Sequence, residues 1–500
     1  MDLIVSSEAR NIIIGTFLGY TVLMFLIGYV SKKIMDKTAV DRYIDEFYTG
    51  GRGMGAFLLA CMIAVGLCSA GTFLGGPGLA HRLGATWAMV ITAQLFMNLL
   101  VLGTVGKKIG IVARRVGAQS LMSLLLHRYN NNVLLGVLGT AAIVLFLGSF
   151  CMAQFVGGAR LFEAMTGLSY TLGLILFAVV VLIVATFGGI KGVALAIVFQ
   201  GAVMTIAVVA LAWGTWSYMG GTEETFRRVA EVNPDLLDPW QFSLPHQISM
   251  WMNFGLLLVA LPHATMGTLT YKNTQAMHKA IIIGAVFVIL WSFVLMGIGL
   301  LSPGIHPDIG TSDHVIPIIT MTVLPPWLAG VTLAGVTAAI QSTVGAMIII
   351  ICSAITKDLY QTFINPTVEA AKLKKVNMIV VGLVCVAAFA ASIQPPYALQ
   401  FLIIFAVGGL ISAFFWPLLL GLYWMKANEY GAVAGMLSGI VVYVLVHGNF
   451  LPIDISLGMH AVAVTFLISG VFSIVVSLLT PKTPYGITRT WFGSLRMKGE

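Results

Sequence analysis

Thirteen long apolar stretches cross this chain, and not one Asp or Glu falls inside any of them. A helix that spans a bilayer needs roughly 20 apolar residues. Its backbone polar groups must also find their partners within the helix. The pattern therefore predicts an all-α polytopic membrane protein with about 13 transmembrane helices. The expected spans are Asn11–Ser31, Met54–Ala80, Ala85–Val105, Val133–Ala159, Ser169–Phe187, Gly192–Ser217, Ile248–Tyr271, Met277–Leu301, Trp327–Cys352, Val376–Ile393, Tyr397–Met425, Tyr430–His447 and Leu457–Thr480.

Composition supports this class of protein. Only 9% of the 500 residues are charged and 59% are hydrophobic, whereas soluble domains carry about 25% charged residues. No segment outside the spans is long enough to fold alone, so we expect residues 1–500 to form a single transmembrane domain. A membrane enzyme needs clustered acids, bases or metal ligands at membrane depth. The spans lack such clusters, so we do not expect an enzyme.

The basic residues lie almost entirely in alternate loops. If the N-terminus is outside, all but five of the 27 Lys and Arg fall in cytoplasmic loops or in the C-terminal tail. Such an asymmetry is typical of cytoplasmic loops, so it predicts a plasma-membrane protein with its N-terminus outside and its C-terminus in the cytoplasm. Basic loops beside anionic headgroups also explain the net charge of +8, so we expect membrane lipid, and no nucleic acid, as a partner. The five outer residues are Arg10, Arg82, Arg160, Arg227 and Arg228.

Two spans carry residues that interrupt helices. The second and seventh spans lie five apart and would enter the membrane from opposite sides. Interrupted helices at matching positions of two inverted halves indicate a transporter's binding site near the bilayer midplane. A break frees backbone carbonyls for a cation and exposes a helix N-terminus that suits an anion. The helix-breaking residues are Gly66, Gly71, Gly75, Gly76 and Pro77 in the second span, and Gly255 and Pro262 in the seventh.

The ninth span supplies two adjacent hydroxyls, those of Ser342 and Thr343. In one interpretation both hydroxyls donate to carbonyls of their own helix, as Ser and Thr in membrane helices usually do. In the other, they face the broken second span together with the Ala339 carbonyl. Hard, neutral oxygens would then enclose a monovalent cation without any carboxylate. The spacing alone leaves both interpretations open.

Several motifs are shared with one family. Residues 339–343 (AIQST) and 353–360 (SAITKDLY) resemble the sodium:solute symporter family, and further motifs are similar to its sodium/pantothenate symporter branch. The similarity runs from about Phe47 to Tyr360 and is weaker beyond. The further motifs are Gly75-Gly76-Pro77-Gly78, Gly106-Lys107-Lys108, Ala113-Arg114-Arg115, the segment from Gln154 to Leu161, Leu261-Pro262-His263 and Tyr271-Lys272.

The resemblance implies a fold of the leucine-transporter type, in which five helices are followed by five more in inverted topology, with flanking helices. The first repeat would cover about residues 54–217 and the second about residues 248–425. It also implies a sodium site between the second and ninth spans. The ligands would be the backbone carbonyls of Val65, Cys68 and Ala339 and the hydroxyls of Ser342 and Thr343.

The chain departs from the family pattern at two positions. Ile197 stands where the family usually has an acidic residue, and Gly267 stands where it often has an arginine. We hypothesise that the two charges are partners in relatives and were lost together here. Either charge alone would be left unpaired in the membrane, at a high energetic cost.

Polar residues near the breaks are the candidates for binding a solute. They are Ser69 and Thr72 at the first break, Gln154 in the fourth span, and Trp251 and Asn253 before the second break. Two of them have alternative roles. Gln154 could instead make a hydrogen bond between helices, since a buried amide needs a partner. Trp251 could instead belong to an interfacial aromatic belt.

Together these features predict a sodium-coupled symporter that imports a small polar or anionic solute, with Na+ as the coupling ion. The resemblance makes pantothenate the expected solute. One alternative is coupling to protons through His263, beside the second break, although a structural hydrogen bond is the more common role of such a side chain. Another is a transporter-like sensor that does not transport. A sensor should continue into a signalling domain, whereas only some twenty residues follow the last span.

Overall fold

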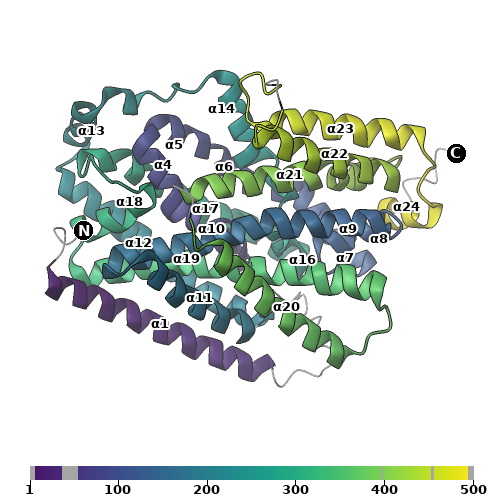
Figure 1. Cartoon of the computed structure of the whole chain (residues 1–500), viewed down its shortest axis with the longest axis horizontal. Helices are drawn as coiled ribbons and strands as arrows, with labels where there is room; N and C mark the ends of the chain where they lie inside the picture. Colours follow the sequence, from purple (N-terminus) through teal and green to yellow (C-terminus); the bar gives the residue numbers. More distant parts are fainter. Residues whose placement is uncertain (1–5, 36–53, 188, 396–397, 452–454, 494–500) are drawn as a thin grey trace.

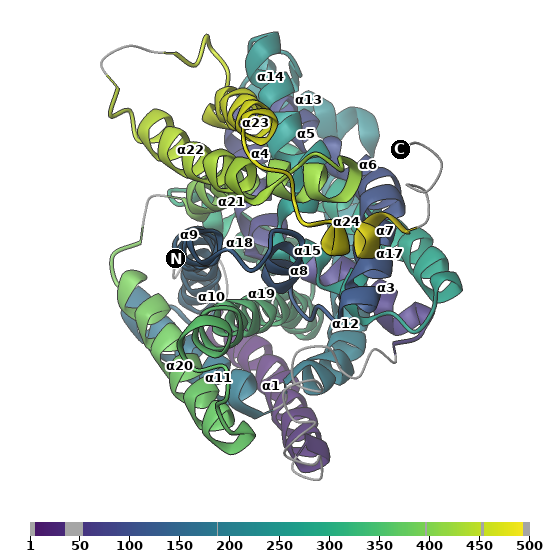
Figure 2. The ribbon, with the colours of Figure 1, turned by 90° about the vertical axis from the view of Figure 1, so that its right-hand side faces the viewer.

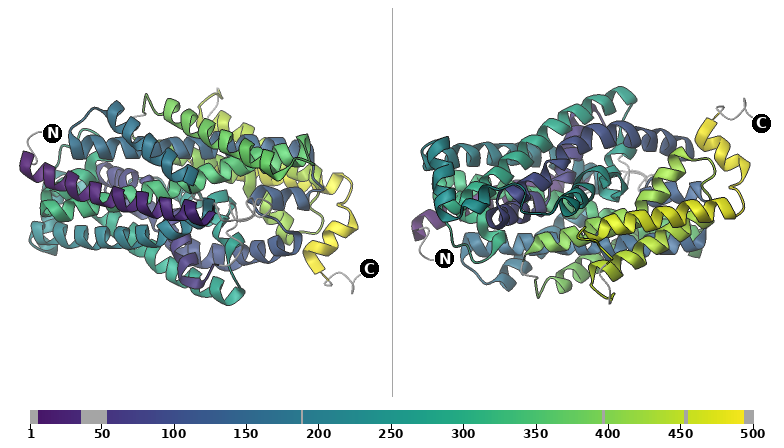
Figure 3. Two further views of the ribbon diagram at one scale, coloured as in Figure 1. Left: turned by 90° about the horizontal axis from the view of Figure 1, so that it is seen from below. Right: turned by 90° about the horizontal axis from the view of Figure 1, so that it is seen from above.

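The computed structural model describes residues 6–35, 54–187, 189–395, 398–451 and 455–493. These residues form an elongated helical bundle (Figure 1), and within them the only β-type pairing is an isolated bridge between Met54 and Tyr271. The view along the bundle in Figure 2 shows α10 and α19 in its middle, with α1, α11 and α20 on one side and α22 and α23 on another. Figure 3 shows from two more directions that the long helices run side by side.

Each of the thirteen expected stretches coincides with helix over most of its length. In the described residues, nine helical segments can each cross a membrane alone, and three bent pairs reach the necessary length together. The chain is therefore a multi-pass membrane protein. Up to the middle of the chain the helices are α1 (Ser7–Met35), α3 (Ala56–Leu67), η2 (Gly71–Gly75), α4 (Gly76–Leu83), α5 (Ala85–Ile91), α6 (Ala93–Phe96), η3 (Met97–Gly106), α7 (Lys107–Val116), α8 (Leu121–Arg128), α9 (Val133–Ala142), η4 (Ile143–Leu147), α10 (Gly148–Thr166), α11 (Tyr170–Phe187), α12 (Gly189–Met219) and α13 (Thr222–Val232).

The second half begins with short helical pieces around the seventh span and continues with long helices. Its elements are η5 (Pro234–Leu237), α14 (Leu244–Trp251), η6 (Met252–Leu256), η7 (Leu258–Ala260), α15 (Pro262–Thr265), α16 (Gly267–Thr270), α17 (Thr274–Leu301), η8 (Ser302–Gly304), η9 (Ser312–His314), α18 (Val315–Val323), α19 (Pro326–Ser353), η10 (Ala354–Ile364), α20 (Ala370–Ala391), α21 (Leu399–Tyr423), α22 (Glu429–His447), α23 (Ala461–Leu479) and α24 (Tyr485–Phe492).

Both predicted breaks are confirmed. The second span bends by 59° between α3 and the segment Gly71–Leu83, and the seventh bends by 51° before Pro262. At each bend one residue leaves the helical conformation: Cys68 has φ −94° and ψ 106°, and Leu261 has φ −77° and ψ 120°. Leu261 is extended because proline disfavours the helical conformation in the residue before it.

A third bend, of 69°, follows the third span and was not expected. There the chain turns at Gly117, whose φ of +70° suits glycine, and starts α8 with a capping box between Ser120 and Ser123. The helix α8 is only 8 residues long, so a search for long apolar stretches misses it. It lies at the same end of the bundle as α7 and α24 (Figure 1).

The helices of the structure are longer than the expected stretches. As a result, four carboxylates lie in long helical segments: Glu8 in α1, Glu163 in α10, Asp358 in η10 and Glu429 in α22. The expected absence of acids therefore holds for the central parts of the spans and not for their ends. Asp358 is buried and accepts hydrogen bonds from the Ser120 hydroxyl at 2.8 and 3.0 Å.

The two termini lie at opposite ends of the bundle (Figure 1), as the predicted thirteen crossings require. The basic helix α7 is at the end that carries α24. Close by, Arg128 is fully buried and donates to the carbonyls of Gly421 and Ala427 at 2.9 Å and of Trp424 at 3.2 Å. A cation among the last carbonyls of α21 is favoured by the helix dipole. Which end faces the cytoplasm stays a prediction.

Candidate solute and cation site

The first break and α19 bring the predicted cation ligands together. Thr343 Oγ1 lies 2.9 Å from the carbonyl oxygen of Ala339, 3.4 Å from that of Cys68 and 3.5 Å from that of Val65. Ser342 Oγ lies 3.0 Å from the same Ala339 oxygen. Carbonyls at the end of a helix lack intrahelical partners, which is why the end of α3 can offer two of them here.

This geometry combines the two interpretations of the hydroxyl pair. Both hydroxyls donate back to Ala339 in their own helix, and Thr343 also reaches across to α3. All five oxygens are neutral and hard, which suits an alkali cation better than a transition metal. In the part of the chain that the structure describes, no group of three or more His, Cys, Asp or Glu could hold a metal ion. The role of the five residues as sodium ligands stays a prediction.

A small cavity lies directly beside this group, between the two broken helices. Ser69, the residue after Cys68, and Thr72 contribute to its wall, and Leu261 and His263 contribute from the second break. Its volume is about 50 Å³. That is enough for a water molecule and far less than the 300–1,000 Å³ typical of ligand pockets.

Two of the five predicted solute-binding residues line this cavity. Thr72 is part of the wall, and Ser69 also starts the helical segment after the break, because its hydroxyl accepts from Gly71 N–H at 3.1 Å. The other three candidates, Gln154, Trp251 and Asn253, are not among its lining residues.

Gln154 holds the first break in place. Its Oε1 accepts from Ala70 N–H at 2.9 Å and its Nε2 donates to Phe150 O at 3.4 Å, so it makes the interhelical bond named as the alternative. Trp251 Nε1 likewise donates to Met89 O at 2.9 Å and joins α14 to α5. Asn253 is fully buried, and neither polar atom of its side chain has a partner among the described residues.

Two amides in the cavity wall were missed from the sequence, Gln94 and Gln400. Gln400 sits against the first break so closely that a Cβ on Gly75 would lie 2.6 Å from its Oε1. That oxygen is buried and has no hydrogen-bond partner in the described ranges. A lone amide in the apolar eleventh span could have flagged Gln400, because the same signal flagged Gln154 in the fourth.

His263 lies on the opposite wall. Its ring packs edge-on against Phe150, with 5.2 Å between the ring centroids. The Nδ1 atom is buried and makes no hydrogen bond to any described residue. The predicted structural hydrogen bond of this atom is therefore not seen, and the ring remains available to a bound solute.

The cavity is closed towards the end of the bundle that carries α13. There η9 packs against α4 so tightly that a Cβ on Gly78 would lie 2.4 Å from Ser312 O. The Asp313 carboxylate accepts from the Leu399 N–H at the start of α21, at 3.2 Å. Burial raises the pKa of Asp313 to about 6. The neighbouring His314 Nε2 lies 3.2 Å from Glu163, and burial lowers the pKa of this histidine.

Of the two positions that lack the family charges, Gly267 lies against α3. Ile197 is buried in α12, which packs on α3. A Cβ on Gly267 would lie 3.0 Å from Ile63 Cγ1 of α3. A side chain at position 267 therefore requires Ile63 to shift. The pairing hypothesis stays a prediction.

Comparison with known proteins agrees with this architecture. A sequence model of the sodium:solute symporter family matches residues 47–439. The chain is 35% identical to the sodium/pantothenate symporter of Haemophilus influenzae over 435 residues, which cover 85% of this chain and 88% of that protein. It is 33% identical to the sodium/pantothenate symporter of Escherichia coli, over 91% of this chain and 94% of that protein.

The fold is also that of solved transporters. A sodium-coupled sialic acid symporter in a substrate-bound, outward-open state superposes with a TM-score of 0.78 at 18% identity, over 95% of this chain and 99% of that one. The expected leucine-transporter type of fold is confirmed, and the relatives are transporters and not enzymes. The repeat boundaries stay a prediction. By the family match and by the identity to its relatives, the chain belongs to the sodium:solute symporter family.

Proposed function

We propose that this protein imports pantothenate together with Na+ through the cell membrane. The observation that carries the proposal is the group of five neutral oxygens between α3 and α19, placed one residue from the solute cavity. The choice of pantothenate as the solute is supported by two relatives, 33% and 35% identical to this chain, that are named as sodium/pantothenate symporters.

Cation binding and solute binding would be coupled because adjacent residues of the first break belong to the two sites. The carbonyl of Cys68 would contact the cation, and the next residue, Ser69, lines the solute cavity. A bound cation would therefore fix the conformation of the segment that also binds the solute. Moving one charge down ~100 mV releases ~2.3 kcal/mol. At ~1.4 kcal/mol per decade this supports about fiftyfold accumulation.

The cavity wall suits a solute with hydroxyl and amide groups. Its polar side chains are Ser69, Thr72, Gln94, His263 and Gln400, and no lysine or arginine of the described residues lines it. The hydroxyls and amide of pantothenate would bind the free Gln400 Oε1 and His263 Nδ1. The charge of its carboxylate would be balanced by the co-transported cation and by the dipole of a broken helix.

The described state is too small for any such solute, because the cavity holds about 50 Å³. Solute entry therefore requires η9 to separate from α4 and the start of α21 to separate from η2. We infer that this closure faces the outside and that α7, α8 and α24 face the cytoplasm. The basic residues of α7 support this orientation.

Uptake in proteoliposomes tests the proposal. Radiolabelled pantothenate should accumulate under an inward sodium gradient, at equal pH on both sides, and should not accumulate when choline replaces sodium. Accumulation of proline in place of pantothenate would overturn the solute assignment. Accumulation that needs no sodium would overturn the coupling.

Proton coupling through His263 is the second candidate, because its Nδ1 faces the cavity without a partner. It predicts uptake driven by an inward proton gradient without sodium, and loss of that uptake in His263→Gln. Sodium coupling predicts that His263→Gln changes the affinity for pantothenate and keeps the sodium requirement.

A further inference from the structure

Two apolar cavities lie on the surface of α17, near the end of the bundle that carries α13. The first, of about 250 Å³, lies between α5 and α17 and is bordered by Met89 and Leu300. The second, of about 180 Å³, lies between α12 and α17 and is bordered by Trp216 and by Thr225 of α13. Both are larger than the solute cavity, and neither takes part in the proposed transport site.

A single ridge separates the two cavities. Phe293 and Gly297 are one helical turn apart on α17, and both of them line both cavities. Phe293 projects outwards and is 69% exposed. At Gly297 a Cβ would have no atom within 4 Å, so the glycine leaves a notch below the aromatic ring. The two cavities are thus two grooves on either side of this ridge.

The grooves open where the protein meets the bilayer. The segment Thr274–Gly304, which contains the ridge, is among the most apolar candidate spans of the described chain. Trp216, which is 54% exposed, lines the second groove, and Trp213, which is 61% exposed, lies three residues before it on α12. Exposed tryptophans are typical of an interfacial aromatic belt.

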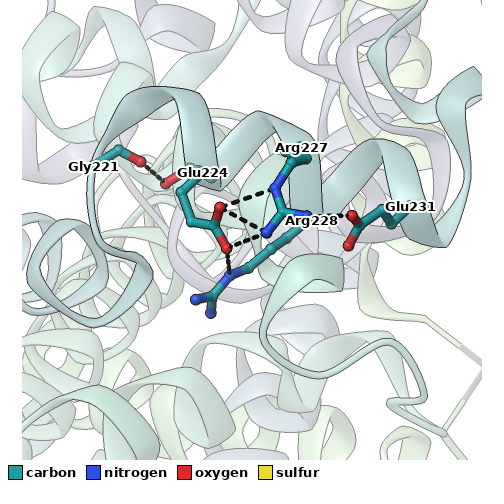
Figure 4. A network of polar contacts seen from close by, with 6 residues as sticks. Gly221, Glu224, Arg227, Arg228 and Glu231 are labelled. Carbon is teal, nitrogen blue, oxygen red and sulfur yellow. Dashed lines mark hydrogen bonds and ion pairs between the residues drawn. The ribbon is translucent and has the colours of Figure 1, made fainter.

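Above the second groove lies the charged helix α13. Glu224 bonds both Arg227, at 2.8 Å, and Arg228, at 2.9 Å (Figure 4), while Thr225 of the same helix faces the groove. An amphipathic helix with charges on one face lies at headgroup level.

We propose that the two grooves form one binding site for a phospholipid, with one acyl chain on each side of the Phe293–Gly297 ridge and the headgroup beside α13. An apolar cavity of 150 Å³ holds a benzene molecule, so each groove has room for a segment of an acyl chain. The grooves continue the lipid-facing surface of α5, α12 and α17. A lipid can therefore enter them directly from the bilayer.

The site shares a wall with the solute cavity. Ile91 and Met296 line both the first groove and that cavity. Between them Ser292 Oγ, which also lines the groove, donates to Gln94 Oε1 of the cavity at 3.3 Å. A lipid in the groove therefore contacts the outer surface of the solute site, whichever solute that site accepts.

Fluorescence quenching by a brominated lipid tests the proposal without any transport assay. The purified protein in detergent is titrated with small amounts of phosphatidylglycerol that carries bromine on both acyl chains. A retained lipid beside Trp216 should give a quenching component that saturates. This component should be absent in Trp216→Phe and present in Trp213→Phe, whose tryptophan is equally exposed but does not line a groove.

A second variant tests the notch itself. Gly297→Leu should abolish the saturable component and the lipid that native mass spectrometry detects on the protein. Gly382→Leu, at another position in a membrane helix with open space around the Cβ, should keep both. Quenching that rises linearly with lipid and is equally affected by the two tryptophan variants would overturn the site. So would a protein dimer that Gly297→Leu dissociates, since a second copy would then cover the grooves.

Discussion

Replacing Thr343 by alanine removes one of the five oxygens at the junction of α3 and α19. Its hydroxyl reaches the carbonyls of Ala339, Cys68 and Val65 at 2.9, 3.4 and 3.5 Å. A hydrogen bond or contact to a charged group contributes about 1.5–3 kcal/mol. At about 1.4 kcal/mol per decade, the sodium concentration for half-maximal uptake should rise roughly ten- to hundredfold.

The assay is pantothenate uptake into proteoliposomes as a function of external sodium, at fixed pH and saturating solute. Thr343→Ser keeps the hydroxyl and should remain within a few-fold of the parent protein. Thr337→Ala is the matched control. Thr337 is buried in the same helix and its hydroxyl donates to Leu333 O at 3.0 Å, like Thr343 to Ala339.

The reasoning fails if Thr343→Ala raises the sodium requirement no more than Thr337→Ala does. In that case the Thr343 hydroxyl makes a hydrogen bond only within its own helix, and its short distance to α3 reflects helix packing and not a shared cation site. The reasoning also fails if Thr343→Ala lowers uptake at every sodium concentration but leaves the sodium concentration for half-maximal uptake unchanged. Thermal unfolding of both variants separates loss of sodium binding from loss of folded protein.

Two further predictions concern the elements that enclose the cavity. A methyl group at Gly75 would lie 2.6 Å from Gln400 Oε1, so Gly75→Ala should lower uptake at least tenfold. The control is Gly28→Ala, which has no atom within 4 Å of its Cβ and should change neither uptake nor Tm. Equal uptake by both variants would contradict the prediction, because it would show that the Gln400 side chain moves aside. Burial in the closed conformation raises the pKa of Asp313 to about 6. Above that pH the carboxylate is ionised and its burial destabilises the folded protein. As the pH falls, the carboxylate is protonated and this destabilisation decreases. Asp313→Asn should therefore unfold at a higher temperature than the parent at pH 7.5, by an amount equivalent to about 2–3 kcal/mol, and this advantage should shrink towards pH 5; an advantage independent of pH would refute it.

The breaks and the cation group could be predicted because their causes are local in sequence. Pro262 forces the residue before it out of the helix, and glycines mark the first break. Ser342 and Thr343 lie near Ala339 by helical spacing alone. The family resemblance implied that carbonyls of the second span join them. The structure brings the Thr343 hydroxyl within 3.5 Å of the Val65 and Cys68 carbonyls, while the Ser342 hydroxyl donates to Ala339 in its own helix. The sequence also marks the membrane spans, since the bilayer imposes length and polarity on each helix separately.

The cavity wall could not be predicted in the same way. Gln154 and Gln400 give the same signal, a lone amide in an apolar span. One of them caps the backbone of the first break and the other faces the cavity. The difference depends on how each helix is rotated about its axis, and this is fixed by long-range packing such as the contact at Gly75. The ends of the spans were similarly misjudged at Glu163 and Asp358. Asp358 accepts from Ser120, which lies far away in the sequence, and Glu163 contacts both Arg160 of its own helix and the distant His314.

The buried Arg128 has a consequence for the order of assembly. Its acceptors at Gly421 and Thr483 are 293 and 355 residues further along the chain. A ribosome therefore produces the cation long before it produces the carbonyls that enclose it. Until α21 and the segment before α24 arrive, the guanidinium must stay in water at the membrane surface. The segment around Thr483 thus completes the burial of a charge from the first quarter or so of the sequence, and a chain that stops before α21 would leave that charge exposed to water at the membrane surface.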